Sequence, residues 1–351
     1  MTAGAAHPVA STEIRMTTLQ STRGYNFWSL RPVTRMDLVV GAYEDISSAD
    51  VPGFVKRLLG AMPGLVEHRC SIGERGGFVL RLRRGTYAPH IIEHVALELQ
   101  TMMGHDVGFG RTRGGDMEGE YTLVFEHMHE QVGLRSAALA LETVQQAFDG
   151  SLDSVEAAVA ELRALAETPD APPLHGRVLC GVTGGTGRAE TARLLRDRLA
   201  DPDALVIDVS PAYLLQAGLP YARANMAIIL DAELTDVPPR YQEEELATKL
   251  VNVLADAVAR DGMVVCPAKA WDIQDYARDS GCRIAVFATD DDVTQRDSRR
   301  ARAVARVRDG RILVEGCGDN QDAGPVDPAM PASSQVAAAL AHATLRTECD
   351  A

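Results

Sequence analysis

One short stretch, residues 85–100, constrains this chain more than any other part of its sequence. At about 100° per residue its apolar side chains share one broad arc of a helix, and Pro89 suits the first helical turn, where a missing N–H costs nothing. His90, Glu93 and His94 fall together on the opposite side. The stretch predicts a helix that buries one stripe and turns two imidazoles and a carboxylate the other way.

The spacing of these three residues is that of the inverted zinc-peptidase motif, H-x-x-E-H. Histidines at i and i+4 can hold one Zn²⁺, and the glutamate beside them can act as base on the metal-bound water. The alternative is a solvent-exposed polar face that carries two histidines. The motif alone leaves both interpretations open.

Composition limits the class of protein. Hydrophobic residues make up 46% and charged residues 24% of the 351 residues, which is typical of a globular chain of about two domains. The net charge of -14 argues against a nucleic-acid partner, and no run of about 18 apolar residues exists to cross a membrane. Six widely spaced cysteines indicate free thiols and therefore a cytoplasmic location.

The pattern along the chain predicts several segments. Residues 1–22 are expected to be a disordered tail, and residues 23–150 alternate between strand and helix, which predicts an α+β domain with strands at 65–70 and 78–83. Residues 151–175 are expected to be a helix and a proline-rich linker. Residues 176–318 predict an α/β, doubly wound, mostly parallel sheet, and residues 319–351 a tail with a final helix.

The first domain resembles the N-terminal domain of cyanophycin synthetase. The resemblance rests on residues 65–71, 75–78, 85–87, 90–100 and 109–113. In some members of that family this domain is a small zinc metallopeptidase that cuts an aspartate–arginine polymer, and in others it only binds the polymer. The resemblance therefore implies either a zinc hydrolase or a binding domain.

Carried over by position, the resemblance implies that His90 and His94 are zinc ligands and that Glu93 is the general base. A third protein ligand is needed to leave one position for water. We expect Glu130 to supply it, with Glu126 as the alternative. A glutamate at position 130 can equally compensate the dipole of the helix that begins there.

Two arginines of a glycine-rich loop are candidates for substrate binding. Arg111 and Arg113 can clamp a substrate carboxylate, or they can form ordinary ion pairs that hold the loop. His68 and His105 are expected to be hydrogen-bonded histidines and not metal ligands.

The second domain resembles the central domain of Mur ligases, the third part of cyanophycin synthetase. Gly184 and Gly187 lie in a phosphate-loop context between a strand and a helix, but Arg188 stands where those ligases have the phosphate-binding lysine. Ala189 replaces a Mg²⁺-binding hydroxyl, and Glu190 adds a negative charge. We expect a degenerate, truncated domain that does not bind ATP. The large ATP-grasp domain of cyanophycin synthetase is replaced here by the short linker.

Three functions remain open at this point. The first is a zinc-dependent hydrolase of a peptide or isopeptide bond, with a small charged peptide or amino-acid-derived substrate. The second is a non-catalytic binding or regulatory partner of a separate amide ligase. The third is an ATP-dependent amide ligase. The sequence favours the first, is compatible with a homo-oligomer, and predicts Zn²⁺ as the cofactor.

Overall fold

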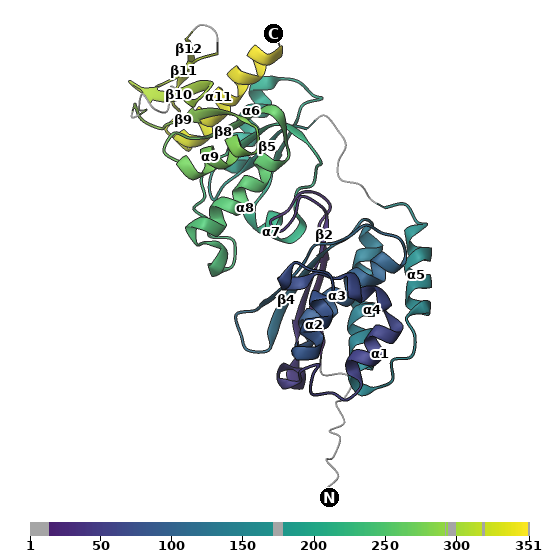
Figure 1. Ribbon diagram of the computed structural model, residues 1–351. Helices are drawn as coiled ribbons and strands as arrows, with labels where there is room; N and C mark the ends of the chain where they lie inside the picture. Colours follow the sequence, from purple (N-terminus) through teal and green to yellow (C-terminus); the bar gives the residue numbers. More distant parts are fainter. Residues whose placement is uncertain (1–13, 171–177, 292, 294–299, 318–319, 350–351) are drawn as a thin grey trace, which may run out of the picture. The chain divides into compact units, whose positions relative to one another are not determined.

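The computed structural model describes residues 14–170, 178–291, 293, 300–317 and 320–349. The chain folds into two compact units (Figure 1). Unit 1 consists of Met1–Thr22 and Arg31–Ala171, and unit 2 of Arg23–Leu30 and Pro172–Ala351. A short excursion near the N-terminus therefore belongs to the second unit, although the sequence predicted that the first domain begins there.

Unit 1 is built on a four-stranded antiparallel sheet. Its strands are β1 (Arg15–Ser21), β2 (Val33–Val39), β3 (Gly110–Gly114) and β4 (Glu120–Glu126), in the order β1-β2-β4-β3. Strand β1 lies in the stretch that was expected to be a disordered tail. It pairs with β2 along most of its length, so that expectation fails for residues 15–21.

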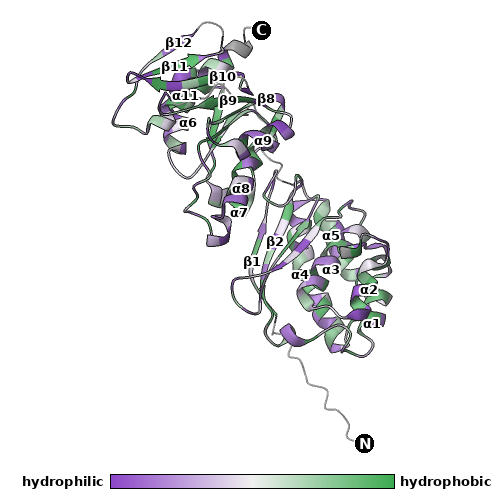
Figure 2. Ribbon diagram, turned by 60° about the vertical axis from the view of Figure 1, so that its left-hand side comes forward, coloured by the Kyte–Doolittle hydropathy of each residue, from purple (hydrophilic) through white to green (hydrophobic). Residues whose placement is uncertain are grey.

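Helices cover one face of this sheet (Figures 1 and 2). They are α1 (Phe54–Ala61), α2 (Gly77–Arg84), α3 (Ala88–Met102), α4 (Glu130–Asp149) and α5 (Glu156–Ala166), with 3-10 turns η1 (Gly41–Asp45), η2 (Pro63–Glu67) and η3 (Cys70–Ile72). Helix α5 is the helix expected within residues 151–175, and it packs into the core of unit 1 through Val159 and Leu162.

Two segments expected to be strands are helical instead. Residues 78–83 lie in α2, where Phe78, Val79 and Leu82 are buried and Leu80 is exposed. That is helical spacing, which a run of alternating apolar residues and arginines conceals in the sequence. Residues 65–70 lie in and between the two short turns η2 and η3. The second of these turns carries Cys70 toward α3.

Unit 2 contains an eight-stranded sheet in the order β12-β11-β10-β9-β8-β7-β5-β6. It is parallel from β6 to β10 and antiparallel across the last two strands. Its strands are β5 (Val178–Thr183), β6 (Leu205–Asp208), β7 (Ala224–Ile229), β8 (Val258–Pro267), β9 (Arg283–Phe287), β10 (Ala303–Arg308), β11 (Arg311–Glu315) and β12 (Gln321–Pro325). The predicted α/β, mostly parallel fold is confirmed.

Both faces of this sheet are buried. Along β7, Ala227 and Ile229 belong to one hydrophobic core, and Met226 and Ile228 belong to the other. Side chains on a strand alternate between faces, so this strand must be covered on both sides. One core includes α7 (Pro211–Ala217), α8 (Glu244–Asp256) and α9 (Trp271–Asp279), beside the short η4 (Pro239–Tyr241), and the other includes α6 (Arg188–Leu199) and α11 (Ala332–Cys349).

Residues 319–351 were expected to be a tail with a final helix; the helix is present as α11, and together with β12 it completes unit 2. Val336 and Leu340 of α11 are fully buried in its core. At the other end of the chain, Phe27 packs edge-on against Tyr241 at 5.3 Å between ring centroids. Among the described residues no helix is both long and apolar enough to cross a membrane.

Candidate metal centre

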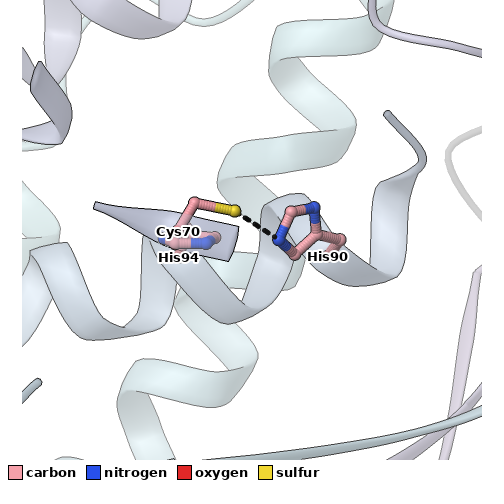
Figure 3. A group of neighbouring side chains, drawn as sticks. All are labelled: Cys70, His90 and His94. Carbon is pink, nitrogen blue, oxygen red and sulfur yellow. Dashed lines mark hydrogen bonds between the residues drawn. The ribbon is translucent and has the colours of Figure 1, made fainter. Parts of the chain in front are cut away.

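Helix α3 places His90 and His94 one turn apart, and η3 brings Cys70 to them (Figure 3). Their ligand atoms all lie within 4.8 Å of one another, and Cys70 Sγ is 3.4 Å from His90 Nε2. In the part of the chain that the structure describes, this is the one group of three or more histidine, cysteine or acidic side chains close enough to hold a metal ion.

The donor types, two imidazole nitrogens and a cysteine sulfur, are ones that Zn²⁺ takes. A tetrahedral zinc with S at 2.3 Å and N at about 2.0 Å separates those two atoms by about 3.5 Å, close to the observed 3.4 Å. Burial, assisted by the nearby Arg81 guanidinium, lowers the pKa of His90 to about 4. Burial and the neighbouring His90 and His68 lower the pKa of His94 to about 2. Both imidazoles are therefore neutral at pH 7, as metal ligands must be.

Further side chains orient these two imidazoles. The Thr86 hydroxyl lies 2.9 Å from His90 Nδ1, which leaves Nε2 of the ring facing Cys70. His68 Nδ1 lies 2.8 Å from Nδ1 of His94, and Phe78 stacks on the His94 ring at 3.9 Å. Such contacts fix the tautomer and the direction of a metal-binding imidazole.

Glu93 projects from the same helix and is only 5% exposed. Thr112 Oγ1 of β3 donates a hydrogen bond to its carboxylate at 2.5 Å. Burial raises the pKa of Glu93 to about 7, although the Thr112 hydrogen bond and the His68 charge act in the opposite direction. Gly110 makes this approach possible, since a Cβ atom there would lie 2.6 Å from Glu93 Oε1. Glu93 and His94 are thus buried, which is contrary to the alternative interpretation of a solvent-exposed polar face.

Cys70, His90 and His94, which we call the metal group, line a cavity of about 1050 Å³. Its lining includes all three members of the metal group, Glu93 and the arginines Arg69, Arg81 and Arg111. Arg113, the second arginine proposed for substrate binding, does not line it. The cavity therefore presents one of the two predicted arginines and two further ones.

The third ligand was expected from Glu130 or Glu126, and the structure places both elsewhere. Glu126 ends β4, where its backbone carbonyl accepts a hydrogen bond from the Gln100 side chain. The Glu126 carboxylate accepts hydrogen bonds from the backbone N–H groups of Gly108 and Phe109. Glu130 begins α4, with its backbone N–H bound to the Asp170 carboxylate. Neither glutamate belongs to the metal group.

Sequence reasoning missed Cys70 because its segment was expected to be a strand. Its backbone adopts a φ of 49°, a left-handed conformation that is uncommon for a residue other than glycine. The turn packs tightly against the start of α2, because a Cβ on Gly77 would lie 1.8 Å from the Arg69 carbonyl oxygen. The two adjacent glycines, Gly76 and Gly77, were the available signal for this close approach.

The glycine loop of unit 2 lies between β5 and α6, as expected. Gly184 and Gly187 have φ values of 139° and 74°. The carboxylate of Asp231 accepts the backbone N–H of Gly185 at 2.6 Å. It also accepts the N–H of Thr186 at 3.4 Å, whereas the Arg188 side chain donates back to the Gly184 carbonyl. An acidic side chain thus occupies N–H groups that a phosphate would need.

Known proteins resemble the part of the chain that carries Cys70, His90 and His94. Residues 35–149 match the family model of the cyanophycin synthase-like N-terminal domain. The cyanophycin synthetase of Synechocystis sp. is 44% identical over 153 residues, which cover 41% of this chain and 17% of that protein. The cyanophycin synthetase of Crocosphaera subtropica is 45% identical over 134 residues, 36% of this chain and 15% of that protein. The match spans about a sixth of the length of these curated relatives.

Solved structures resemble the chain only distantly. A pseudomurein peptide ligase type C from Methanothermus fervidus has a TM-score of 0.36 at 9% identity, covering 57% of this chain and 50% of that chain. A UDP-N-acetylmuramoylalanyl-D-glutamyl-2,6-diaminopimelate–D-alanyl-D-alanyl ligase from Acinetobacter baumannii has a TM-score of 0.31 at 12% identity, covering 47% and 43%. The specific similarity therefore lies in unit 1, where residues 35–149, with the whole metal group among them, match the cyanophycin synthase-like N-terminal domain.

Proposed function

We propose that unit 1 is a zinc-dependent hydrolase of a peptide or isopeptide bond. The observation that carries this proposal is the placement of a buried glutamate, Glu93, beside Cys70, His90 and His94 at the wall of a cavity. Two imidazoles and a thiolate are sufficient to hold Zn²⁺ and leave one position for water.

In this proposal each residue has a separate task. Zn²⁺, when bound, polarises the scissile carbonyl and lowers the pKa of a water molecule toward neutrality. Glu93 accepts the proton of the attacking water and passes it to the leaving amine. Burial raises the pKa of this carboxyl group to about 7 when no ion is bound, and the charge of Zn²⁺ would lower it and favour the carboxylate that acts as base. Thr112 holds the carboxylate in place.

The cavity suggests a small charged substrate. Arg111 can bind a carboxylate in a bidentate manner, and the net charge of -14 favours substrates that carry arginine elsewhere. Aspartate–arginine isopeptides combine these features and are the first compounds to test.

A ligase-type function is the second candidate. The specific observation in its favour is that the curated relatives over this region are named synthetases, and none of the relatives reported above is named a hydrolase. Unit 1 would then bind the substrate of an amide ligase, either this chain or a separate protein. The Asp231 carboxylate in the glycine loop counts against ATP binding in unit 2. Calorimetric titration with ATP–Mg²⁺ separates the two, because micromolar binding would favour the ligase.

The decisive assay is the release of free amine from aspartate–arginine isopeptides without added nucleotide. We expect the wild type to cleave, and Glu93→Gln to lose at least about 100-fold in rate while it retains zinc, because only the base is removed. A chelator should abolish cleavage, and added zinc should restore it. Zinc binding without cleavage of any acidic or basic peptide would contradict the hydrolase and leave the binding function.

A further inference from the structure

The outer strand of the unit 1 sheet, β3, runs past the metal group with one edge unpaired. It is the last strand in the order β1-β2-β4-β3, and Gly110 and Thr112 line the cavity. Thr112 also reaches Glu93. The edge of the sheet and the base of the proposed reaction therefore lie side by side.

The register shows which backbone groups point outward. Gly110 pairs with Phe125 in the antiparallel β3–β4 ladder, and the bonded pairs that flank it join Phe109 to Glu126 and Gly115 to Glu120. Bonded and non-bonded pairs alternate along such a ladder. Positions 111 and 113 are therefore bonded to β4, whereas positions 110, 112 and 114 direct their N–H and C=O groups to the free edge.

The charged side chains of the cavity indicate which charge a peptide bound at this edge would carry. Its acidic side chains are engaged: Glu98 contacts His68 at 3.0 Å, Glu93 accepts from Thr112, and Glu67 pairs with Arg75. Its arginines differ in this respect. Within the described residues, the three arginines that line the cavity make no ion pair; they are Arg69, Arg81 and Arg111. Guanidinium groups without an ion-pair partner favour a ligand that bears carboxylates.

We propose that the free edge of β3 is the docking strand for the substrate, and that the substrate is an extended, acidic peptide. Its backbone adds a strand beside Gly110, Thr112 and Gly114, and its carboxylates lie against the three arginines. This deepens the proposed hydrolase function and rests on it, because strand addition at Gly110 and Thr112 carries the peptide backbone past Glu93.

The test measures binding separately from cleavage. The full chain carrying Glu93→Gln is titrated into fluorescein-labelled hexa-aspartate, and binding is followed by fluorescence anisotropy. We expect binding below about 1 mM, with hexa-asparagine and hexa-lysine at least about tenfold weaker. No binding of hexa-aspartate, or tighter binding of hexa-lysine, would overturn the proposal.

Backbone pairing is tested by removing single N–H groups. In the same background, Gly114→Pro removes an outward N–H and should weaken binding by roughly tenfold. Gly114→Ala keeps the N–H, adds a Cβ with nothing within 4 Å, and should bind as the parent does. Equal binding by the two variants would exclude strand addition at this position.

A second arm does not depend on the folding of the proline variant. Two hexa-aspartates are N-methylated at alternate residues, one at the odd and one at the even positions. Only one of them loses the N–H groups that face β3, so their affinities should differ by roughly tenfold. Equal affinities would overturn the docking strand. If hexa-aspartate binds in this pattern but the wild type cleaves no peptide, the hydrolase fails and the docking strand stands.

Discussion

The metal group of unit 1 and the glycine loop of unit 2 differ in what their polar groups are bonded to. In unit 1, Thr86 and His68 contact Nδ1 of His90 and Nδ1 of His94, and Nε2 of His90 faces Cys70 at the cavity. In unit 2, the outward N–H groups of the loop are themselves bound by Asp231. The side chains of the metal group are oriented at a cavity, whereas in the glycine loop a carboxylate already occupies the N–H groups that a phosphate would need.

This difference shows that the function of a sequence motif is best inferred from the groups to which its residues are bonded. Both regions keep the backbone that their resemblance predicts, with a helix at His90 and His94 and a strand–loop–helix at Gly184 and Gly187. Only the first also keeps supporting side chains that orient the candidate ligands. We therefore propose the chemistry for unit 1 and a structural role for the loop of unit 2.

The largest effect is expected at Gly110. In Gly110→Ala the new Cβ would lie 2.6 Å from Glu93 Oε1 and must displace the carboxylate. We expect roughly 100-fold slower amine release with unchanged zinc content, since a displacement of about 1 Å is enough for that loss. Gly60→Ala is the matched control, because a Cβ there has nothing within 4 Å. Full activity in Gly110→Ala would indicate that Glu93 does not take part in the reaction.

A smaller effect is expected from His68→Ala. This substitution removes the imidazole that lies 2.8 Å from His94 Nδ1. Zinc affinity, measured by competition with a chelator, should fall by roughly 10- to 100-fold, the usual cost of losing such a partner. His105→Ala removes another imidazole of unit 1 and should leave the affinity unchanged. Equal losses in both variants would indicate a general effect on stability instead of support for the metal group.

The smallest effect is expected from Asp231→Ala in unit 2. Loss of the carboxylate leaves the N–H groups of Gly185 and Thr186 without it, so the free energy of unfolding should fall by about 1 kcal/mol. Urea denaturation of the variant beside Asp236→Ala, which alters an exposed acid of the same segment, measures the difference. If the two variants are equally stable, Asp231 does not hold the loop.

Much of the fold follows from periodicity in the sequence. The helix at residues 88–102 and the alternation of strands and helices in unit 2 are strong local signals, and both are present as predicted. Strand β1 was missed, and α11 was predicted only as the end of a tail, because their stabilisation comes from packing partners far away in the chain. The alanine-rich α11 has no marked apolar stripe of its own, yet Val336 and Leu340 are fully buried.

The site could be predicted only as far as a single helix carries it. His90, Glu93 and His94 lie on one helix, so their spacing determines their proximity. Cys70 is 20 residues earlier in a short turn with a left-handed residue, and no periodic pattern marks such a turn. Glu130 was predicted as the third ligand because inverted-motif peptidases take a ligand from a helix after the motif. The residues of this chain do not support that extension.

The most direct test of the metal centre is the zinc content of protein purified without a histidine tag. We predict about one Zn²⁺ per chain in the wild type and in Glu130→Ala, and loss of that zinc in Cys70→Ala, because only Cys70 belongs to the group with His90 and His94. Unfolding curves of the two variants show whether both remain folded. Zinc retained in Cys70→Ala but lost from Glu130→Ala, or a wild type without zinc, would contradict this account.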